Sequence, residues 1–294
     1  MRRPPVQSDL SCERRPLHVV CCVAGNWLAI AALVWLACKV PAVPAALVFV
    51  CIGIQQHALS LWMHEGSHWL IFRNRGLNDA FSNLVLANPL FISLGSYRHR
   101  HFLHHRHLGE AQDTKTVIFS SVRGWEFLRF CLRTLLGLRF LTLGGEFVQA
   151  AERQRGWWVS VALVQTGIFS AFAWLGHPTY YLWFWVLPFV TVFQVVASLR
   201  AVIEHQPLPG ESHPFTRTLR PTLLDGLVFC RAGFEHHWMH HHHAGVPYFN
   251  LPHVCEHAPT ATMGYFETLR ALVRGVETGY RSSSEERVRC SASN

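Results

Sequence analysis

Residues 45–68, AALVFVCIGIQQHALSLWMHEGSH, join an apolar run to a pair of histidines. The apolar part, from Ala45 to Met63, has about the length that an α-helix needs to cross a bilayer. His64 and His68 follow four residues apart, so both imidazoles lie on one face if the helix continues. The stretch therefore predicts a membrane-spanning helix that brings two metal-binding side chains to one membrane surface.

Three further apolar runs have the length and composition of membrane-spanning helices. They extend from His18 to Cys38, from Trp157 to Leu175 and from Tyr180 to Ala201. Half of all residues are hydrophobic and only 15% are charged, which is typical of a chain with several such spans. We therefore predict an all-α integral membrane protein with four transmembrane helices.

Two other segments favour helices that lie in the membrane interface. The segment from Trp125 to Leu143 contains three arginines, which together would cost on the order of 8 kcal/mol at the centre of a transmembrane helix. We expect an amphipathic interfacial helix instead, with Leu128, Leu132 and Leu135 facing inward. A second, shorter interfacial stripe consists of Leu77, Phe81, Leu84 and Val85.

The distribution of arginines predicts how the chain is oriented. Arg2, Arg3, Arg14 and Arg15 precede the first span, so the positive-inside rule places the N-terminus in the cytoplasm. Four crossings return the C-terminus to the cytoplasm and place a helical cap on that side. No linker divides the chain, so we expect one domain over residues 17–275, between a flexible arm at 1–16 and a flexible tail at 276–294.

Charge and cysteine content narrow the possible partners. The formal net charge of +8 comes largely from arginines beside the membrane, where they attract anionic headgroups. Because no separate basic surface is evident, we do not expect nucleic-acid binding. The nine cysteines form no CxxC pair and lie mostly in apolar runs, so we expect reduced thiols that pack in the core.

Two more histidine clusters follow the first pair. They are HFLHH at 101–105 and HWMHH at 237–241, and each places its imidazoles on one side of a helix. Eight imidazoles exceed what one tetrahedral ion can use, and neutral imidazole suits iron, zinc, copper and nickel. The simplest interpretation is a two-metal centre in the cytoplasmic cap, with these candidate ligands: His64, His68, His101, His104, His105, His237, His240 and His241.

The order HxxxH, HxxHH, HxxHH resembles the histidine boxes of the membrane fatty-acid desaturase and hydroxylase superfamily. The flanking residues match as well, over roughly residues 45 to 270. They include Phe72-Arg73-Asn74-Arg75 after the first box, Tyr97-Arg98 before the second and Gly245-Val246-Pro247-Tyr248 after the third. The resemblance implies two iron ions as cofactors and O2 as co-substrate.

The resemblance also implies a ninth ligand, and the sequence offers three carboxylates as candidates to support the ligands. Similar proteins often carry a further histidine between the second and third boxes, which is His205 here. We expect Glu65, Asp113 and Glu204 to accept hydrogen bonds from ligand imidazoles and so fix their tautomers. We interpret His57 as a core or pore-lining histidine. We expect the histidines that adjoin the boxes either to support the ligands or to lie on the surface.

The reaction implied by the resemblance is O2-dependent insertion of a double bond into a fatty acyl chain. The substrate would be an acyl lipid, an acyl-carrier conjugate or a free fatty acid, reached from the bilayer. Because no cytochrome b5-like or ferredoxin-like segment is evident, we expect a separate electron donor with its reductase: ferredoxin, rubredoxin or a cytochrome b5-like protein.

Other functions stay open at this point. Hydroxylation or ketolation of a lipid or other apolar substrate needs the same metal centre. A zinc protease would use His64, Glu65 and His68 but leaves two HxxHH sets unexplained, and a metal transporter would place its histidines at mid-bilayer depth. Many desaturases have Asn before the third box, where this chain has Gly233, Glu235 and His236, and some relatives have Asn where Ala201 stands. The boxes therefore do not predict the substrate or the position of the double bond.

Overall fold

The computed structural model describes residues 12–40, 42–115, 122–138, 156–208, 215–229, 233–253 and 263–275. Every regular element within these ranges is helical. Four helices are long and apolar enough to cross a membrane, which confirms the predicted fold class. Most of the predicted N-terminal arm and all of the predicted tail lie outside the described residues.

The first two spans form a helical hairpin. Helix α2 (Pro16–Lys39) begins with a proline, which fits the first turn because its missing N–H has no partner there anyway. Helix α3 (Ala45–Ser67) runs back beside α2, and the Asn26 amide donates to the Gln55 side chain at 2.8 Å between them. Helix α3 continues four residues past the predicted end of its apolar run, so it carries the first histidine box on its last turn.

The other two spans are α8 (Trp157–Trp174) and a continuous helical stretch, Leu182–His205. This stretch comprises the π-helical turns η4 (Leu182–Val186) and η5 (Phe189–Phe193), followed by α9 (Gln194–His205). The stretch extends beyond Ala201, where the apolar run ends, and its last residue is His205.

Helix α3 packs closely against the π-helical turns. The Gln56 side chain donates to the Trp185 carbonyl at 2.8 Å. A Cβ added at Gly53 would lie 2.5 Å from Cβ of Val192, so this crossing requires a residue without a side chain. The close approach fixes the ends of the second and fourth spans relative to each other.

The interfacial segments differ in part from the prediction. Helix α6 covers Trp125–Leu135, and its three predicted inward leucines, Leu128, Leu132 and Leu135, are each at least 44% exposed. The larger rings of Phe127 and Phe130 pack against the core instead, because the helix turns this face toward α9. The leucines thus face away from the protein, where lipid can cover them.

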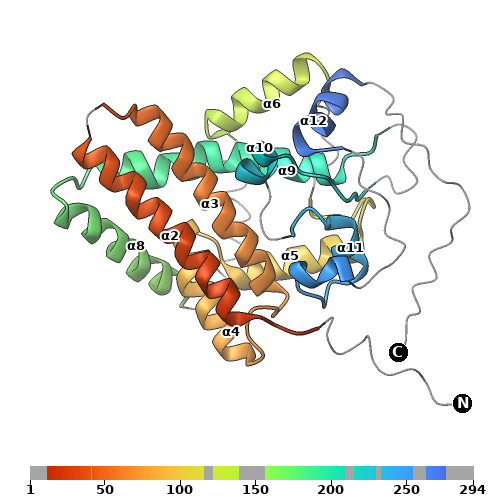
Figure 1. The fold of residues 1–294 in the computed structure, drawn as a ribbon, viewed down its shortest axis with the longest axis horizontal. Helices are drawn as coiled ribbons and strands as arrows, with labels where there is room; N and C mark the ends of the chain where they lie inside the picture. Colours follow the sequence, from red (N-terminus) through yellow and green to blue (C-terminus); the bar gives the residue numbers. More distant parts are fainter. Residues whose placement is uncertain are drawn as a thin grey trace, which may run out of the picture.

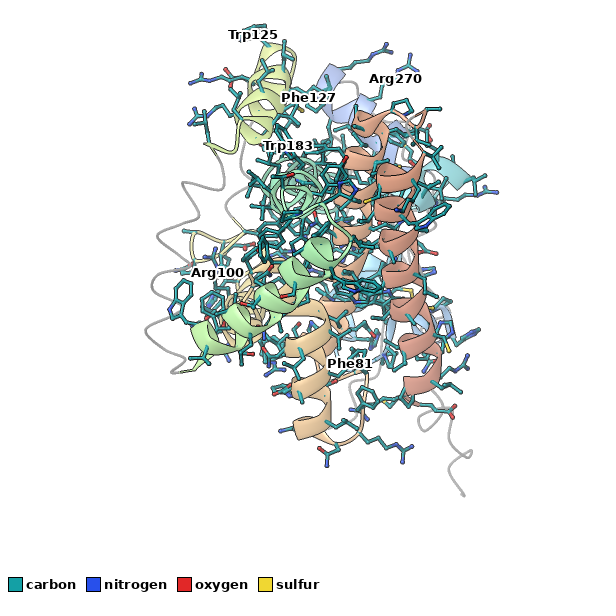
Figure 2. All side chains as sticks on the ribbon, turned by 90° about the vertical axis from the view of Figure 1, so that its left-hand side faces the viewer. Phe81, Arg100, Trp125, Phe127, Trp183 and Arg270 are labelled. Carbon is teal, nitrogen blue, oxygen red and sulfur yellow. The ribbon has the colours of Figure 1, made fainter. Side chains whose placement is uncertain are left out.

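The second predicted stripe divides between two faces. It begins in α4 (Arg75–Phe81) and continues through the π-helical turn η1 (Ser82–Ala87) and the 3-10 turn η2 (Asn88–Leu90). Leu77 and Leu84 are each 53% exposed, whereas Phe81 and Val85 pack against the core. Figure 2 shows Phe81 and Trp125 near opposite ends of the molecule, so the two interfacial segments lie far apart.

Short helices form the cap beyond the ends of α3 and α9 (Figure 1). They are α5 (Leu94–Arg106), α10 (Leu223–Val228), α11 (His237–His242), the 3-10 helix η6 (Tyr248–His253) and α12 (Tyr265–Arg274). Helices α5 and α11 lie beside the ends of α3 and α9 that carry histidines (Figure 1). The fold therefore brings four helices to one place at a single end of the membrane-spanning bundle.

Candidate metal centre

The first histidine box is held by the way α3 ends. The Asn78 side chain donates to the Gly66 carbonyl at 2.8 Å and accepts from the Ile71 backbone N–H at 3.2 Å. These bonds satisfy the backbone around the sharp turn that follows His68. His64 and His68 are both buried, on the face of α3 that looks toward the cap.

The second and third boxes lie on α5 and α11. Ser93 caps α5 by accepting a hydrogen bond from the Ser96 backbone N–H at 3.3 Å. Helix α11 has only six residues, and the backbone N–H of Trp238 within it donates to the Arg217 carbonyl at 3.2 Å. This hydrogen bond attaches the short helix to the segment between α9 and α10.

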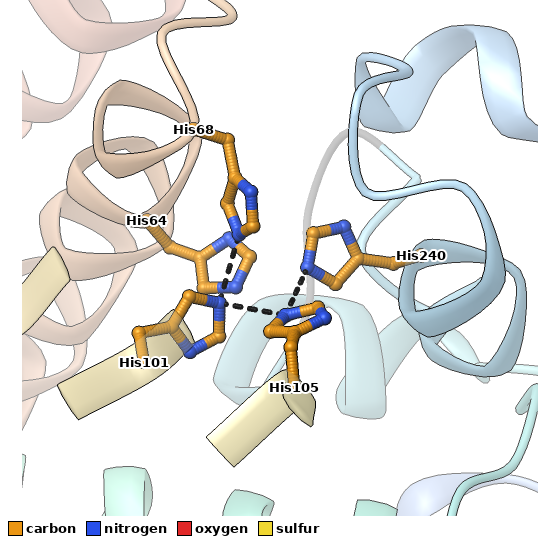
Figure 3. Close-up of side chains that lie close together, drawn as sticks. All are labelled: His64, His68, His101, His105 and His240. Carbon is orange, nitrogen blue, oxygen red and sulfur yellow. Dashed lines mark hydrogen bonds between the residues drawn. The ribbon is translucent and has the colours of Figure 1, made fainter. Parts of the chain in front are cut away.

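Five predicted ligands form the first cluster, in which one ligand atom from each residue lies within 4.8 Å of the others. Figure 3 shows their rings converging from α3, α5 and α11. The Nε2 atoms are 2.8 Å apart for His68 and His101, 2.9 Å for His101 and His105, and 3.2 Å for His105 and His240. The members of the first cluster are His64, His68, His101, His105 and His240.

The remaining four predicted ligands form the second cluster. Nε2 of His237 lies 2.9 Å from Nε2 of His205 and 3.1 Å from Nε2 of His241. His104, His205 and His241 also have ligand atoms within 4.8 Å of one another. The rings of His105 and His241 stack with centroids 4.2 Å apart, so the two clusters adjoin. All nine predicted histidines are therefore brought together.

The hydrogen bonds at the far side of the rings fix which nitrogen points into the second cluster. His104 donates through Nδ1 to Asp113 Oδ1 at 2.8 Å, and His205 donates through Nδ1 to the Phe215 carbonyl at 2.8 Å. In a neutral ring the Nε2 lone pair then points inward. Both ring nitrogens of His64 and Nε2 of His104 are buried without a hydrogen-bond partner among the described residues.

Buried lone pairs that face one another without protons are costly unless a cation lies between them. The donor set is made of imidazole nitrogens, which suit first-row transition metals such as iron. The residues of both clusters therefore fit a pair of metal ions.

The electrostatic environment keeps these imidazoles neutral. Burial, together with the nearby charges of Arg98 and Lys115, lowers the pKa of His68 to about 3. Burial likewise lowers the pKa of His104 to about 4 and that of His105 to about 2. Metal binding requires unprotonated imidazole, so the site holds its ligands in the binding form at neutral pH.

The three predicted carboxylates differ in what they contact. Asp113 meets the expectation, since it accepts from His104 and from the backbone N–H groups of Gly109 and Lys115 at 3.0 and 2.8 Å. Glu204 pairs with Arg200 at 2.7 Å and accepts from Tyr265, but its carboxylate is 3.7 Å from His237 Nδ1, beyond hydrogen-bond distance.

Glu65 does not occupy the expected position beside a ligand. Its carboxylate is buried, and no imidazole among the described residues donates to it. Its position between two ligands in sequence did not predict its contacts, because neighbouring residues on a helix point in different directions.

Three residues of the centre were not among the predicted site residues, although Tyr97 and Tyr248 belong to the segments that flank the histidine boxes. Nζ of Lys115 lies 3.3 Å from Nε2 of His205, and burial lowers the pKa of this lysine to about 8. The ring of Tyr97 stacks on His101 and that of Tyr248 on His240, with centroids 5.5 and 4.8 Å apart. These side chains form the wall around the clusters.

The histidines outside the predicted set point elsewhere. His57 Nε2 lies 3.3 Å from the Phe229 carbonyl, within the core. His242 Nδ1 donates to the Trp238 carbonyl at 2.8 Å, so the run of four histidines contributes only its first two members, 240 and 241, to the clusters.

Together, four candidate membrane spans and a buried nest of imidazoles at one end of them define a polytopic membrane protein with a histidine-rich metal centre. The sequence model of the fatty acid desaturase family matches residues 39–266, which is most of the chain. The chain belongs to the fatty acid desaturase family.

A characterised relative gives a second comparison. The chain is 25% identical over 229 residues to dihydrorhizobitoxine desaturase of Bradyrhizobium elkanii. The aligned region covers 70% of this chain and 65% of the relative's length.

Proposed function

We propose that this chain is an O2-dependent desaturase whose nine clustered histidines hold two iron ions. The observation that carries the proposal is the convergence of nine neutral imidazoles, seven of them buried and two half-buried, in two adjoining clusters. The first cluster would hold one ion with five imidazoles, and the second would hold the other with His104, His205, His237 and His241.

Iron in such a site supplies the redox chemistry with O2 that removes hydrogen from an unactivated C–H bond. The protein's own residues keep the imidazoles neutral, fix their tautomers through Asp113 and the Phe215 carbonyl, and exclude water by burial. These contributions match what a protein adds to metal-dependent catalysis, namely ligand geometry, orientation and a dry site.

We propose an acyl chain or a similar apolar compound as substrate, taken up from the bilayer. Support comes from the family and from the exposed leucines of α6 and α4, which give the bilayer an apolar approach beside the cap. The relative's name describes a desaturase, so desaturation is preferred to hydroxylation for this chain. A zinc protease or a metal transporter has no use for nine histidines gathered at one end of the spans.

The experiment combines metal analysis with product analysis. Protein purified after iron-replete expression should contain close to two irons per chain and little zinc. Supplied with O2 and a ferredoxin-type donor with its reductase, it should convert an acyl substrate to a product lighter by two hydrogens. Gain of one oxygen would identify a hydroxylase, and a single tightly bound zinc would refute the oxygenase proposal.

A further inference from the structure

A solvent-exposed aromatic side chain lies directly beside the first cluster. Phe102 on α5 is 38% exposed, and its ring centroid is 5.2 Å from that of His68. The indole of Trp69, 6.0 Å from Phe102, meets it edge to face. An aromatic path of one residue therefore connects the protein surface to a predicted ligand.

Three arginines hold Trp69 in place. The guanidinium carbons of Arg98 and Arg75 lie 4.0 and 4.8 Å from the indole centroid, and Nε of Arg14 donates to the Trp69 carbonyl at 2.9 Å. The backbone of Trp69 has φ 57°, a left-handed conformation that residues other than glycine rarely adopt. Backbone strain of this kind concentrates at functional sites.

The arginines leave an excess of positive charge. Arg98 pairs with Asp79 at 2.5 Å, whereas Arg14 and Arg75 have no ion pair within the part of the chain that the structure describes. Three guanidinium groups against one carboxylate leave a net charge of +2 around one indole. A surface of this kind attracts an acidic partner and accelerates its association.

We propose that Arg14, Trp69, Arg75, Arg98 and Phe102 form a docking surface for an acidic one-electron carrier protein of the ferredoxin type. We call these five residues the aromatic–arginine surface. Electrons would pass from the carrier to the first cluster through Phe102 and His68. Electron transfer slows steeply with distance, so a short path is required. Among the described residues, Phe102 is the only aromatic side chain that is more than one third exposed and also contacts the ring of a cluster histidine.

This inference rests on the proposed function, whose electron balance requires such a donor. Desaturation removes two hydrogens, and with them two electrons, from neighbouring carbons of the substrate. Two further electrons, from two reduced carrier molecules that become oxidised, and two protons from solvent complete the reduction of O2 to two waters. A lipid headgroup would also bind arginines, but its binding does not require an aromatic contact between the surface and a cluster histidine. The Phe102–His68 contact therefore favours an electron carrier.

The test uses the full-length, iron-loaded chain in nanodiscs of phosphatidylcholine, with a reduced plant-type [2Fe–2S] ferredoxin as probe. Stopped-flow absorbance follows ferredoxin oxidation, and parallel samples are reduced with dithionite. We expect Arg75→Glu to raise the half-saturating ferredoxin concentration at least tenfold. Arg270→Glu, at an exposed arginine of α12 at the far end of the molecule from α4, is the matched control and should match wild type (Figure 2).

The aromatic step has its own variant. Phe102→Leu keeps an apolar side chain but removes the ring. The ratio of the limiting rate with ferredoxin to the rate with dithionite should therefore be at least tenfold lower in this variant than in wild type. The half-saturating ferredoxin concentration should change less than it does in Arg75→Glu, because leucine keeps an apolar contact and the three arginines are unchanged. A limiting rate equal to that of wild type would overturn the path through Phe102.

The remaining outcomes separate this inference from the proposed function. Product formed with dithionite, together with wild-type half-saturation in Arg75→Glu, would overturn the docking surface alone. An effect of Arg75→Glu confined to nanodiscs with anionic lipid would do the same, since the surface would then bind headgroups. No product with any reductant would overturn both. If Arg75→Glu does not fold, the test uses the wild-type protein at increasing salt concentration. Added salt should then weaken ferredoxin binding, and binding that does not depend on salt would refute the docking surface.

Discussion

At the scale of single residues, the centre depends on which ring nitrogen of each histidine carries the proton. Asp113 and the Phe215 carbonyl accept from the Nδ1 atoms of His104 and His205, so the Nε2 atoms face the second cluster. Spacing in the sequence is enough to predict eight of the nine histidines, because i, i+3 and i+4 positions share a helix face. The ninth, His205, is implied only by the family resemblance. Spacing does not predict Lys115, whose approach to His205 joins residues 90 positions apart.

His205 tests whether the second cluster binds iron. His205→Ala should lose about one of two irons per chain and nearly all activity, as severely as His104→Ala, because each removes one of four imidazoles from the same cluster. The control is His57→Ala, which removes a core histidine outside both clusters and should retain both irons. Inductively coupled plasma mass spectrometry measures the iron. Two irons in His205→Ala would remove this residue from the ligand set.

Asp113 tests how much the fixed tautomer of His104 contributes to iron affinity. Asp113→Ala should weaken iron binding by about 10–100-fold, since residues that orient metal-ligating histidines typically have effects of this size. Glu65→Ala is the matched comparison, because it removes a buried carboxylate that contacts no imidazole. Competition with a chelator of known affinity measures both. Equal weakening in the two variants would show that the loss comes from buried charge rather than from the bond to His104.

At the scale of elements, two long helices carry histidines beyond the apolar part of their spans. Hydropathy predicts the four spans but ends α3 at Met63 and the fourth span at Ala201, whereas the helices continue to Ser67 and His205. The polar residues of the boxes end the apolar pattern while the backbone stays helical. The π-helical turns have no signature in composition. The spacing of leucines predicts a leucine face of α6 turned inward, whereas Phe127 and Phe130 occupy the inward face.

Gly53 tests the crossing of α3 with η5. Gly53→Ala should destabilise the protein by about 1–3 kcal/mol, because the new methyl group would collide with Val192 in a packed interior. Gly25→Ala in α2 is the matched control, since nothing lies within 4 Å of the added Cβ. Thermal unfolding in detergent measures both variants. Equal melting temperatures would show that the crossing can separate without loss of stability.

At the scale of the whole molecule, the clusters lie where α3 and α9 end, so both hairpins must insert before the centre can assemble. The order of the boxes and the family resemblance predict this arrangement, and the structure brings the nine predicted histidines together. Substrate identity cannot be predicted in the same way. It depends on the shape of an interior path, which is set by side chains from several helices rather than by any local pattern.

Topology tests the predicted orientation. Single cysteines introduced near Val43 and His177 should react with an impermeant thiol reagent from outside the cell, in a background without native cysteines. Cysteines at the exposed positions Glu110 and Arg270 should react only after the membrane is opened, because the positive-inside rule places the cap in the cytoplasm. Opposite sides for 110 and 270 would mean that the α6 segment crosses the membrane.

If the clusters hold iron as proposed, the shortness of α11 makes the stability of this protein depend on the iron supply of its cell. Six residues are too few for a helix to be stable by itself, yet three of them are predicted ligands. Iron that binds only the folded form therefore stabilises this part of the chain by mass action. During iron starvation, newly made chains should keep their membrane spans but expose α11 to proteases, so that supply of the metal controls turnover of the protein. Pulse-chase labelling should give a shorter half-life with an iron chelator, and an unchanged half-life would contradict this link.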